Sequence, residues 1–163
     1  MVALKPGKPA PAWTLPDVKG KSVTLLEDLR QGPVVLAFFK VSCPVCQYAF
    51  PLLERVHRAY PKAAIYGVSQ NSAKDTERFC REFGVTFPVL LDDPKSYAVS
   101  NAYGLTNVPT IFYIAQDGMI EVSSVGWSRS DVEDIGRRLG TIGKVPVAAL
   151  FKPGEEVSDF RAG

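Results

Sequence analysis

The sequence of 163 residues contains only three cysteines and one histidine, His57. Three cysteines are too few for the disulfide framework of a small secreted protein, and a chain of this length does not need one. Structural zinc usually takes four cysteine or histidine ligands, so a zinc site is the weaker explanation for two cysteines that stand close together. The scarcity of both residue types favours redox chemistry at that pair.

Long apolar runs and blocks of like charge are also missing. No apolar stretch approaches the roughly 20 residues of a membrane span, and residues 1–7 show no secretory signal. We therefore expect a cytoplasmic protein, or a periplasmic one if a leader has been removed. The net charge of +2 comes from interspersed charges. Arg137–Arg138 fits a solvated helix face, so we expect no nucleic-acid partner.

The chain instead contains alternating strand and helix patterns. A Pro- and Gly-rich start with a turn at 17–20 predicts a hairpin of residues 12–15 and 22–25. The continuous apolar run 34–39 predicts a strand buried on both faces. Further strands are expected at 63–69, 87–91, 110–115 and 119–125, and helices at 44–60, 72–83, 95–103 and 129–139.

This order predicts an α/β fold, a mixed β-sheet flanked by helices on both faces. We expect one domain over residues 1–142, with an N-terminal extension 1–32. Residues 143–163 are rich in Gly, Pro and charge and predict an irregular tail.

The segment Cys43-Pro44-Val45-Cys46 follows the buried strand and opens a helix. A thiol attacks a disulfide as the thiolate, which the N–H groups and dipole of a helix N-terminus stabilise. Proline suits the first helical position, which needs no N–H. We predict Cys43 as the nucleophile and Cys46, one turn inside, as the thiol that resolves a mixed disulfide.

Pro109 follows Val108 and opens a strand, a place where a cis bond is credible. A proline there leaves the neighbouring backbone free to pair with an extended peptide. The predicted substrate-contacting residues are Val108, Pro109, Phe39, Pro44 and Val45.

The cysteine motif, Pro51 eight positions after Cys43, and Val108-Pro109-Thr110 together resemble the thioredoxin superfamily. The patterns at 7–15 and 20–25 resemble more specifically the TlpA-like proteins and their peroxiredoxin relatives. The resemblance covers about residues 5–140. It implies a thioredoxin-like fold, thiol–disulfide exchange by Cys43 and Cys46, and Pro109 as a cis-proline facing them. It also implies protein disulfides or dithiols as substrates and a redox partner that resets the pair. We expect a monomer with no metal or organic cofactor.

The chain departs from this family in its acidic groups. Ala37 stands where thioredoxins have a buried Asp, and Asn71 lies near the place of an acid in some TlpA-like proteins. Ser42 replaces a Trp that often precedes the first cysteine. The proton acceptor for Cys46 is therefore open among Glu54, Lys40 and water.

Two other functions compete with disulfide exchange. Peroxiredoxins carry Pro-x-x-x-Thr/Ser-x-x-Cys, but Leu36 and Lys40 occupy those places, which disfavours peroxide reduction. A redox-sensing or partner-binding module is the non-enzymatic alternative.

Two further residues have simpler explanations. Cys80 shares a helix face with Phe79 and Phe83, so we expect a buried, inert thiol rather than a third redox thiol. We expect His57 at a helix surface rather than in catalysis.

Overall fold

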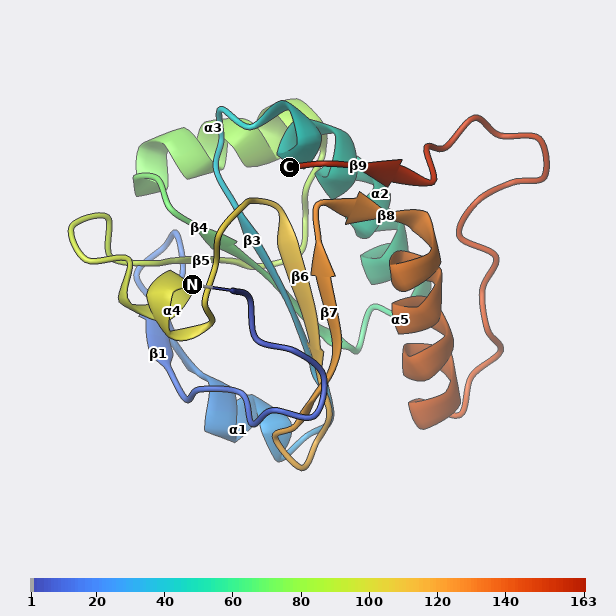
Figure 1. Ribbon diagram of the computed structural model, residues 1–163, viewed down its shortest axis with the longest axis horizontal. Coiled ribbons are helices and arrows are strands. Elements are labelled where there is room, and N and C mark those ends of the chain that lie inside the picture. Colours follow the sequence, from blue (N-terminus) through green and yellow to red (C-terminus); the bar gives the residue numbers. More distant parts are fainter. Residues whose placement is uncertain (1) are drawn as a thin grey trace.

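The computed structural model describes residues 2–163 and centres on a five-stranded sheet in the order β5–β4–β3–β6–β7 (Figure 1). The three strands at one side of it are parallel to each other, whereas β6 is antiparallel to both β3 and β7. This is the mixed sheet that the sequence predicts. The strands are β3 (Val34–Phe39), β4 (Ala64–Ser69), β5 (Val89–Leu91), β6 (Thr110–Ile114) and β7 (Ile120–Val125).

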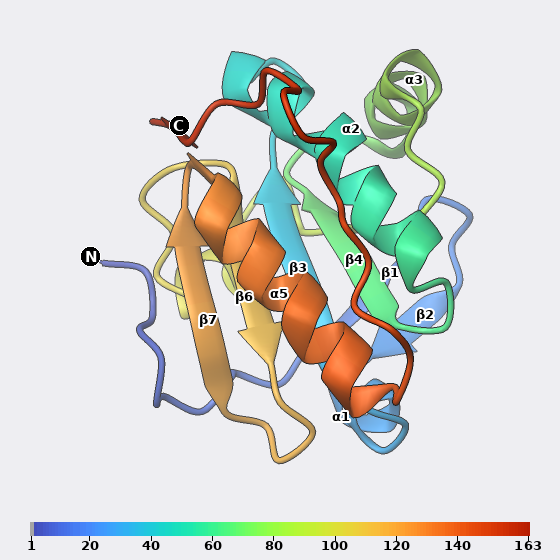
Figure 2. The ribbon, with the colours of Figure 1, turned by 90° about the vertical axis from the view of Figure 1, so that its right-hand side faces the viewer.

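Strand β3 is buried along its whole length because helices cover both faces of the sheet. Val35, Ala37 and Phe39 pack into one core, with α2 (Pro44–Ala59), α3 (Ala73–Phe83) and α5 (Arg129–Ile142). The other residues of β3, Val34, Leu36 and Phe38, pack into a second core on the opposite face of the sheet. This core also contains residues of α1 (Leu25–Leu29), α4 (Ala98–Ala102) and the N-terminal segment. Figures 1 and 2 show this layering of helices around the sheet.

The N-terminal extension contains the predicted hairpin, formed by β1 (Thr14–Pro16) and β2 (Ser22–Thr24). Gly20 closes its turn at φ +88°, a left-handed conformation that favours glycine. The Trp13 ring meets the Tyr66 ring edge-on, with centroids 6.4 Å apart, and so holds the extension against the sheet.

Two elements are shorter by two or more residues than the sequence predicts. Strand β5 begins at Val89, because Pro88 has no N–H and the Phe87 N–H donates to Glu54 instead of the sheet. Helix α4 begins at Ala98, because Tyr97 at φ +49° ends a turn in which its N–H donates to Asp93.

The C-terminal tail runs back between α2 and α5 (Figure 2). Residues 143–159 form no helix or strand, but they are anchored: Phe151 is buried in the core, and Arg55 makes a two-pronged ion pair with Glu155 at 2.8 and 2.7 Å. The tail ends in strand β9 (Phe160–Arg161), which the sequence does not predict. This strand pairs antiparallel with β8 (Trp127–Ser128).

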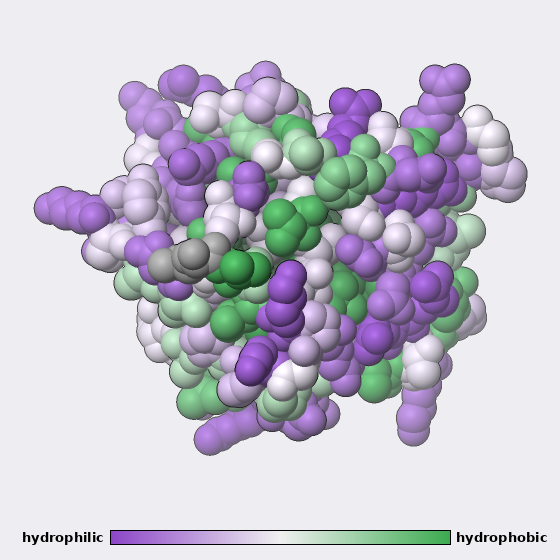
Figure 3. All heavy atoms as spheres, in the orientation of Figure 1, coloured by the Kyte–Doolittle hydropathy of each residue, from purple (hydrophilic) through white to green (hydrophobic). Residues whose placement is uncertain are grey.

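The surface carries small apolar groups among polar side chains on the face seen in Figure 3. Among the helices of residues 2–163, none has both the length and the apolar character needed to cross a bilayer.

Glu54 is a buried carboxylate on α2 that joins this helix to the loop before β5. It accepts hydrogen bonds from the Thr86 N–H at 2.8 Å, the Thr86 hydroxyl and the Phe87 N–H, and pairs with Arg58. Burial by itself raises the pKa of Glu54, but these hydrogen bonds outweigh it and hold the pKa below the usual range.

We predict that Glu54→Gln lowers the free energy of unfolding at pH 7 by about 1–3 kcal/mol, since it removes charge-assisted hydrogen bonds in a buried place. A carboxylate with a lowered folded pKa stabilises the protein above its unfolded pKa, and that stabilisation is lost as pH falls through the folded value. The deficit should therefore shrink below about pH 4. Urea unfolding at pH 7 and below about pH 4 measures this loss of stability, with Glu82→Gln at an exposed position as the control. Equal stability of variant and parent at pH 7 would contradict this role.

Candidate active site

Cys43 lies where β3 has ended and α2 begins, and it is the N-cap residue of that helix. Its backbone is extended, at φ −80° and ψ 116°, so the side chain turns back over the first helical turn. There its Sγ accepts a hydrogen bond from the Cys46 N–H at 3.2 Å, while Pro44 fills the first helical position. An N-cap side chain in this position receives the free N–H groups and the positive end of the helix dipole, both of which favour a negative sulfur.

The two thiols have different surroundings. Cys43 is half-buried, whereas Cys46 is fully buried beneath it. Burial raises the pKa of the Cys46 thiol far above its ordinary value; the hydrogen bond with Cys43 adds to this, and the backbone of Lys40 opposes it. Cys43 is thus the sulfur that a partner can reach, and Cys46 is a protonated thiol directly behind it.

The loop before β6 faces Cys43. The Val108–Pro109 peptide bond is cis, and the Cys43 thiol donates to the Val108 carbonyl with an Sγ–O distance of 3.5 Å. Because β6 is antiparallel to β3, Thr110 pairs with Phe38, and the start of β6 lies beside the end of β3. The sheet therefore brings together residues 65 positions apart in the sequence.

Two side chains hold the loop that precedes Cys43. The Asn71 side-chain oxygen accepts from the Val41 N–H at 2.9 Å, and the Gln47 amide donates to the Val41 carbonyl at 3.0 Å. The sequence distinguishes Asn71 only by the lack of an acid at that place and does not predict that its side chain holds this loop. Its place after β4, beside the carboxyl end of β3, is the signal that identifies it.

The prediction that Phe39 contacts substrate is wrong. Its side chain is fully buried between Phe50 and Phe79, with ring centroids 4.2 and 4.9 Å away. Both faces of β3 are covered, so the last residue of the strand points into a core even though it is near Cys43 in sequence. Pro44 is exposed and Val45 half-buried, so both remain accessible to a partner.

Glu54 is also wrong as a proton acceptor for Cys46, since its oxygens are occupied by Thr86, Phe87 and Arg58. Within residues 2–163, no carboxylate hydrogen bonds to Cys46 and none contributes to its raised pKa. Lys40 is exposed at the rim of the site.

Cys80 and His57 lie outside this group. Cys80 is half-buried on α3, where burial first and the charge of Glu77 second raise its pKa to about 11. His57, late in α2, packs edge-on against Phe87 at 6.1 Å between ring centroids. Neither hydrogen bonds to the Cys43–Cys46 pair. In the described chain, residues 2–163, no group of three or more His, Cys, Asp or Glu is arranged to hold a metal ion.

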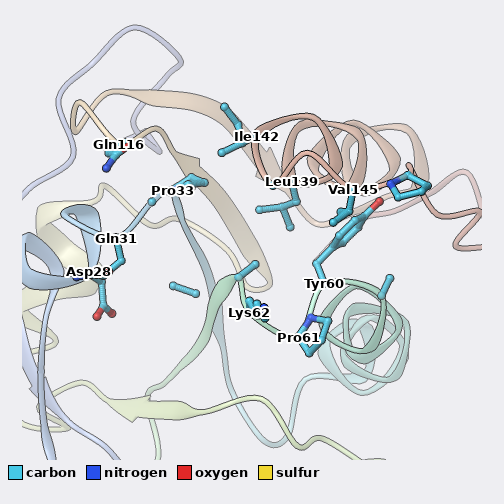
Figure 4. Close-up of a pocket in the computed structure, with 16 residues that line it drawn as sticks. Asp28, Gln31, Pro33, Tyr60, Pro61, Lys62, Gln116, Leu139, Ile142 and Val145 are labelled. Carbon is cyan, nitrogen blue, oxygen red and sulfur yellow. The ribbon is translucent and has the colours of Figure 1, made fainter.

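A pocket of about 710 Å³ lies at the opposite end of the sheet (Figure 4). Its apolar lining includes Pro33, which precedes β3, together with Tyr60, Leu139 and Val145. The six residues of β3, about 20 Å of extended chain, separate Pro33 from the end that carries Cys43. This pocket and the thiols are therefore separate features.

Solved structures identify the class. The thioredoxin domain of a thiol–disulfide oxidoreductase from Bacteroides vulgatus matches with a TM-score of 0.71 and 25% identity, over 87% of this chain and 98% of that one. A putative thiol:disulfide interchange protein DsbE from Chlorobium tepidum matches with a TM-score of 0.73 and 26% identity, over 85% and 98%. The chain is an oxidoreductase with a thioredoxin-like fold.

The family is identified by the sequence comparison. The model of the AhpC/TSA family matches residues 6–123, well over half of the chain, so the protein belongs to the AhpC/TSA family. Thiol-disulfide oxidoreductase ResA of Geobacillus kaustophilus (strain HTA426) is 32% identical over 143 residues, which are 86% of this chain and 79% of that protein. Thioredoxin-like protein YneN of Bacillus subtilis (strain 168) is 28% identical over 130 residues, 77% and 74% of the two chains.

We predict that Cys80 reacts slowly with alkylating reagents. With a pKa of about 11, about one Cys80 side chain in a thousand is a thiolate at pH 8. Mass spectrometry of iodoacetamide labelling in the variant Cys43→Ser/Cys46→Ser measures the rate, which should rise about tenfold per pH unit between pH 8 and 10. A rate at pH 8 equal to that of a free cysteine peptide would show Cys80 to be a reactive thiol.

Proposed function

We propose that this protein exchanges two electrons with protein disulfides or dithiols through Cys43 and Cys46. The observation that carries the proposal is the arrangement of the pair: the accessible Cys43 sulfur accepts the Cys46 N–H at 3.2 Å, and the Cys46 thiol is buried behind it. The names of its relatives, thiol–disulfide oxidoreductases and interchange proteins, support the same chemistry.

In the reducing direction the first step forms a mixed disulfide. The Cys43 thiolate attacks one sulfur of the substrate disulfide, so a bond forms between Cys43 and that sulfur while the substrate S–S bond breaks. The second substrate sulfur leaves as a thiolate and takes a proton from solvent. The free N–H groups of the first turn of α2 stabilise the attacking sulfur.

The second step uses Cys46. Its thiol loses a proton, and the resulting thiolate attacks the Cys43 sulfur, which forms the Cys43–Cys46 disulfide and expels the other substrate sulfur. The substrate gains two electrons and the pair loses two. Oxidation of a substrate dithiol is the same sequence reversed, and the relative reduction potentials determine its direction.

The backbone beside the pair provides a place for the polypeptide around the substrate disulfide. Val108 presents its carbonyl 3.5 Å from the Cys43 sulfur, and Pro109 has no N–H to donate. An extended peptide that pairs with this backbone edge would bring its disulfide to Cys43.

Peroxide reduction has less support in the site. The two places of the peroxidatic pattern hold Leu36, buried within β3, and Lys40, exposed beyond its end. Neither provides the proline or the hydroxyl of that pattern.

We predict that Cys43→Ser lowers the rate of disulfide reduction at least about a hundredfold, because Cys46 is buried and the raised pKa of Cys80 leaves that thiol little thiolate with which to attack. Cys46→Ser should instead accumulate a mixed disulfide with the substrate, since its resolving thiol is gone. Multiple-turnover reduction of a disulfide peptide, with mass spectrometry of the trapped species, tests both variants. Cys80→Ser is the matched control and should retain activity. Full turnover by Cys43→Ser would refute the role of Cys43 as the nucleophile. A parent protein that reacts only once with the disulfide would instead indicate a redox-sensing module.

We predict that resolution of the mixed disulfide accelerates with pH. Burial, the largest cause of the raised Cys46 pKa, persists after Cys43 is bonded to substrate, so Cys46 stays mostly protonated at pH 7. Its thiolate fraction then rises about tenfold per pH unit. Rapid-quench measurement of the resolution rate between pH 6 and 9 should give a slope near one on a logarithmic scale. A plateau from pH 7 upward would mean that the mixed disulfide places the Cys46 pKa in the neutral range.

A further inference from the structure

The end of the C-terminal tail lies against the backbone that faces Cys43. Asn107 donates its side-chain N–H to the Gly163 carbonyl oxygen at 3.2 Å. A Cβ added to Gly163 would lie 2.1 Å from the Val108 oxygen and 3.3 Å from the Pro109 ring. Only a residue without a side chain fits there, so the two backbones are in direct contact. The Val108 oxygen is the same atom that Cys43 contacts at 3.5 Å.

The tail also covers a second loop beside the site. Gly126, between β7 and β8, donates its N–H to the Pro109 carbonyl at 2.7 Å, which joins the two loops. A Cβ on Gly126 would lie 2.5 Å from the Arg161 oxygen. Pro109 and Gly126 are both buried, whereas residues 159–163 are exposed on their outer side. The end of the tail is therefore a single layer of extended chain over this edge, at the end of the molecule where α2 begins (Figures 1 and 2).

The attachment is strong up to Ser158 and weak beyond it. The Trp127 indole donates to the Ser158 carbonyl at 2.7 Å, and the Ser158 N–H donates to the Tyr48 hydroxyl at 2.9 Å. Beyond this point residues 159–163 are exposed, and their contacts are polar or with backbone. Strand β9 pairs with β8, the Asp159 carbonyl accepts the Arg129 N–H at 2.9 Å, and the Gly163 carbonyl accepts from Asn107. Arg161 donates to the Ser158 hydroxyl at 3.0 Å, and its guanidinium lies 3.9 Å above the centre of the Tyr48 ring. Segments with few buried apolar contacts open at a lower free energy than the rest of the fold.

We propose that residues 159–163 form an intramolecular cover over the Val108–Pro109 edge, hinged at Ser158, which a polypeptide substrate must displace to reach Cys43. An extended peptide uses the backbone edge that the tail now covers, whereas a small disulfide needs only the sulfur, which is half-exposed. The cover thus selects against polypeptides that bind this edge weakly. This inference rests on the proposed function.

The test compares the parent with a chain that ends after Asp159. That variant lacks β9 but retains Ser158 with its contacts to Trp127 and Tyr48. We expect the KM for an extended disulfide peptide to fall at least about fivefold, and the rate with hydroxyethyl disulfide to change less than twofold. Arg161→Ala removes the contact with the Tyr48 ring and the hydrogen bond to the Ser158 hydroxyl but leaves the backbone of the tail in place. It should shift KM in the same direction, and it provides the test if the shortened chain does not fold. Arg81→Ala, on the exposed side of α3, is the matched control and should leave KM unchanged.

A peptide with the sequence of residues 158–163 gives the converse test. It should inhibit the shortened chain competitively against the disulfide peptide and inhibit the parent less. An unchanged KM in both the shortened chain and Arg161→Ala would refute the proposal that the tail is a cover. A raised KM would also refute it, because it would show that the tail helps to bind substrate.

One readout does not depend on turnover. In the Cys46→Ser/Cys80→Ser background, removal of residues 160–163 should accelerate labelling of Cys43 by a bulky maleimide. Accelerated labelling in a protein that reduces no disulfide would support the cover while refuting the proposed function. Unchanged labelling and KM in a protein that does reduce disulfides would refute the cover alone.

Discussion

The junction between β3 and α2 is the constraint on which the rest of the site depends. A strand buried on both faces ends at Phe39, and four residues later Cys43 must be extended so that its sulfur meets the first N–H groups of the helix. Because β3 lies between β4 and β6, its end also adjoins the residues after β4 and those that precede β6. Asn71 comes from the first and Val108 from the second. The strand order therefore brings Cys43, the support of its loop and the Val108 backbone together at one end of the sheet.

The different burial of the two thiols divides their roles. A thiol that is buried and lacks a carboxylate partner resists ionisation, so Cys46 does not compete with Cys43 for an incoming disulfide. In the proposed exchange, Cys46 reacts only when a mixed disulfide places a sulfur directly before it, where proximity compensates for the small thiolate fraction. At the end of β4 the side chain of Asn71 is an amide, which accepts from the Val41 N–H and holds the loop before Cys43.

Much of the fold could be predicted from the sequence because its signals are local. The apolar run 34–39 gives β3 its observed bounds. Ser72 and Ser128 cap the N-termini of α3 and α5, and Gly84 caps the C-terminus of α3, and these residue types are common at such positions. The orientation of Phe39 could not be predicted, since a strand with two buried faces has no alternation to show which core each residue enters. The start of β5 depends on a hydrogen bond to Glu54, a residue distant in sequence. Strand β9 has two residues and no periodic pattern, and it exists only because β8 lies beside it.

A weak cover can still matter because it is tethered. Ser158 is five residues from Gly163, and a segment joined by so short a link has an effective concentration of about millimolar at its own site. A free peptide that makes only the same backbone contacts would have to reach that concentration to compete. A polypeptide substrate displaces the tail at lower concentration if it adds contacts that the tail lacks, for example with the exposed Pro44 or the half-buried Val45. Affinity for the Val108 edge alone would then be insufficient, and selection would depend on how well the substrate fits the cysteine loop itself.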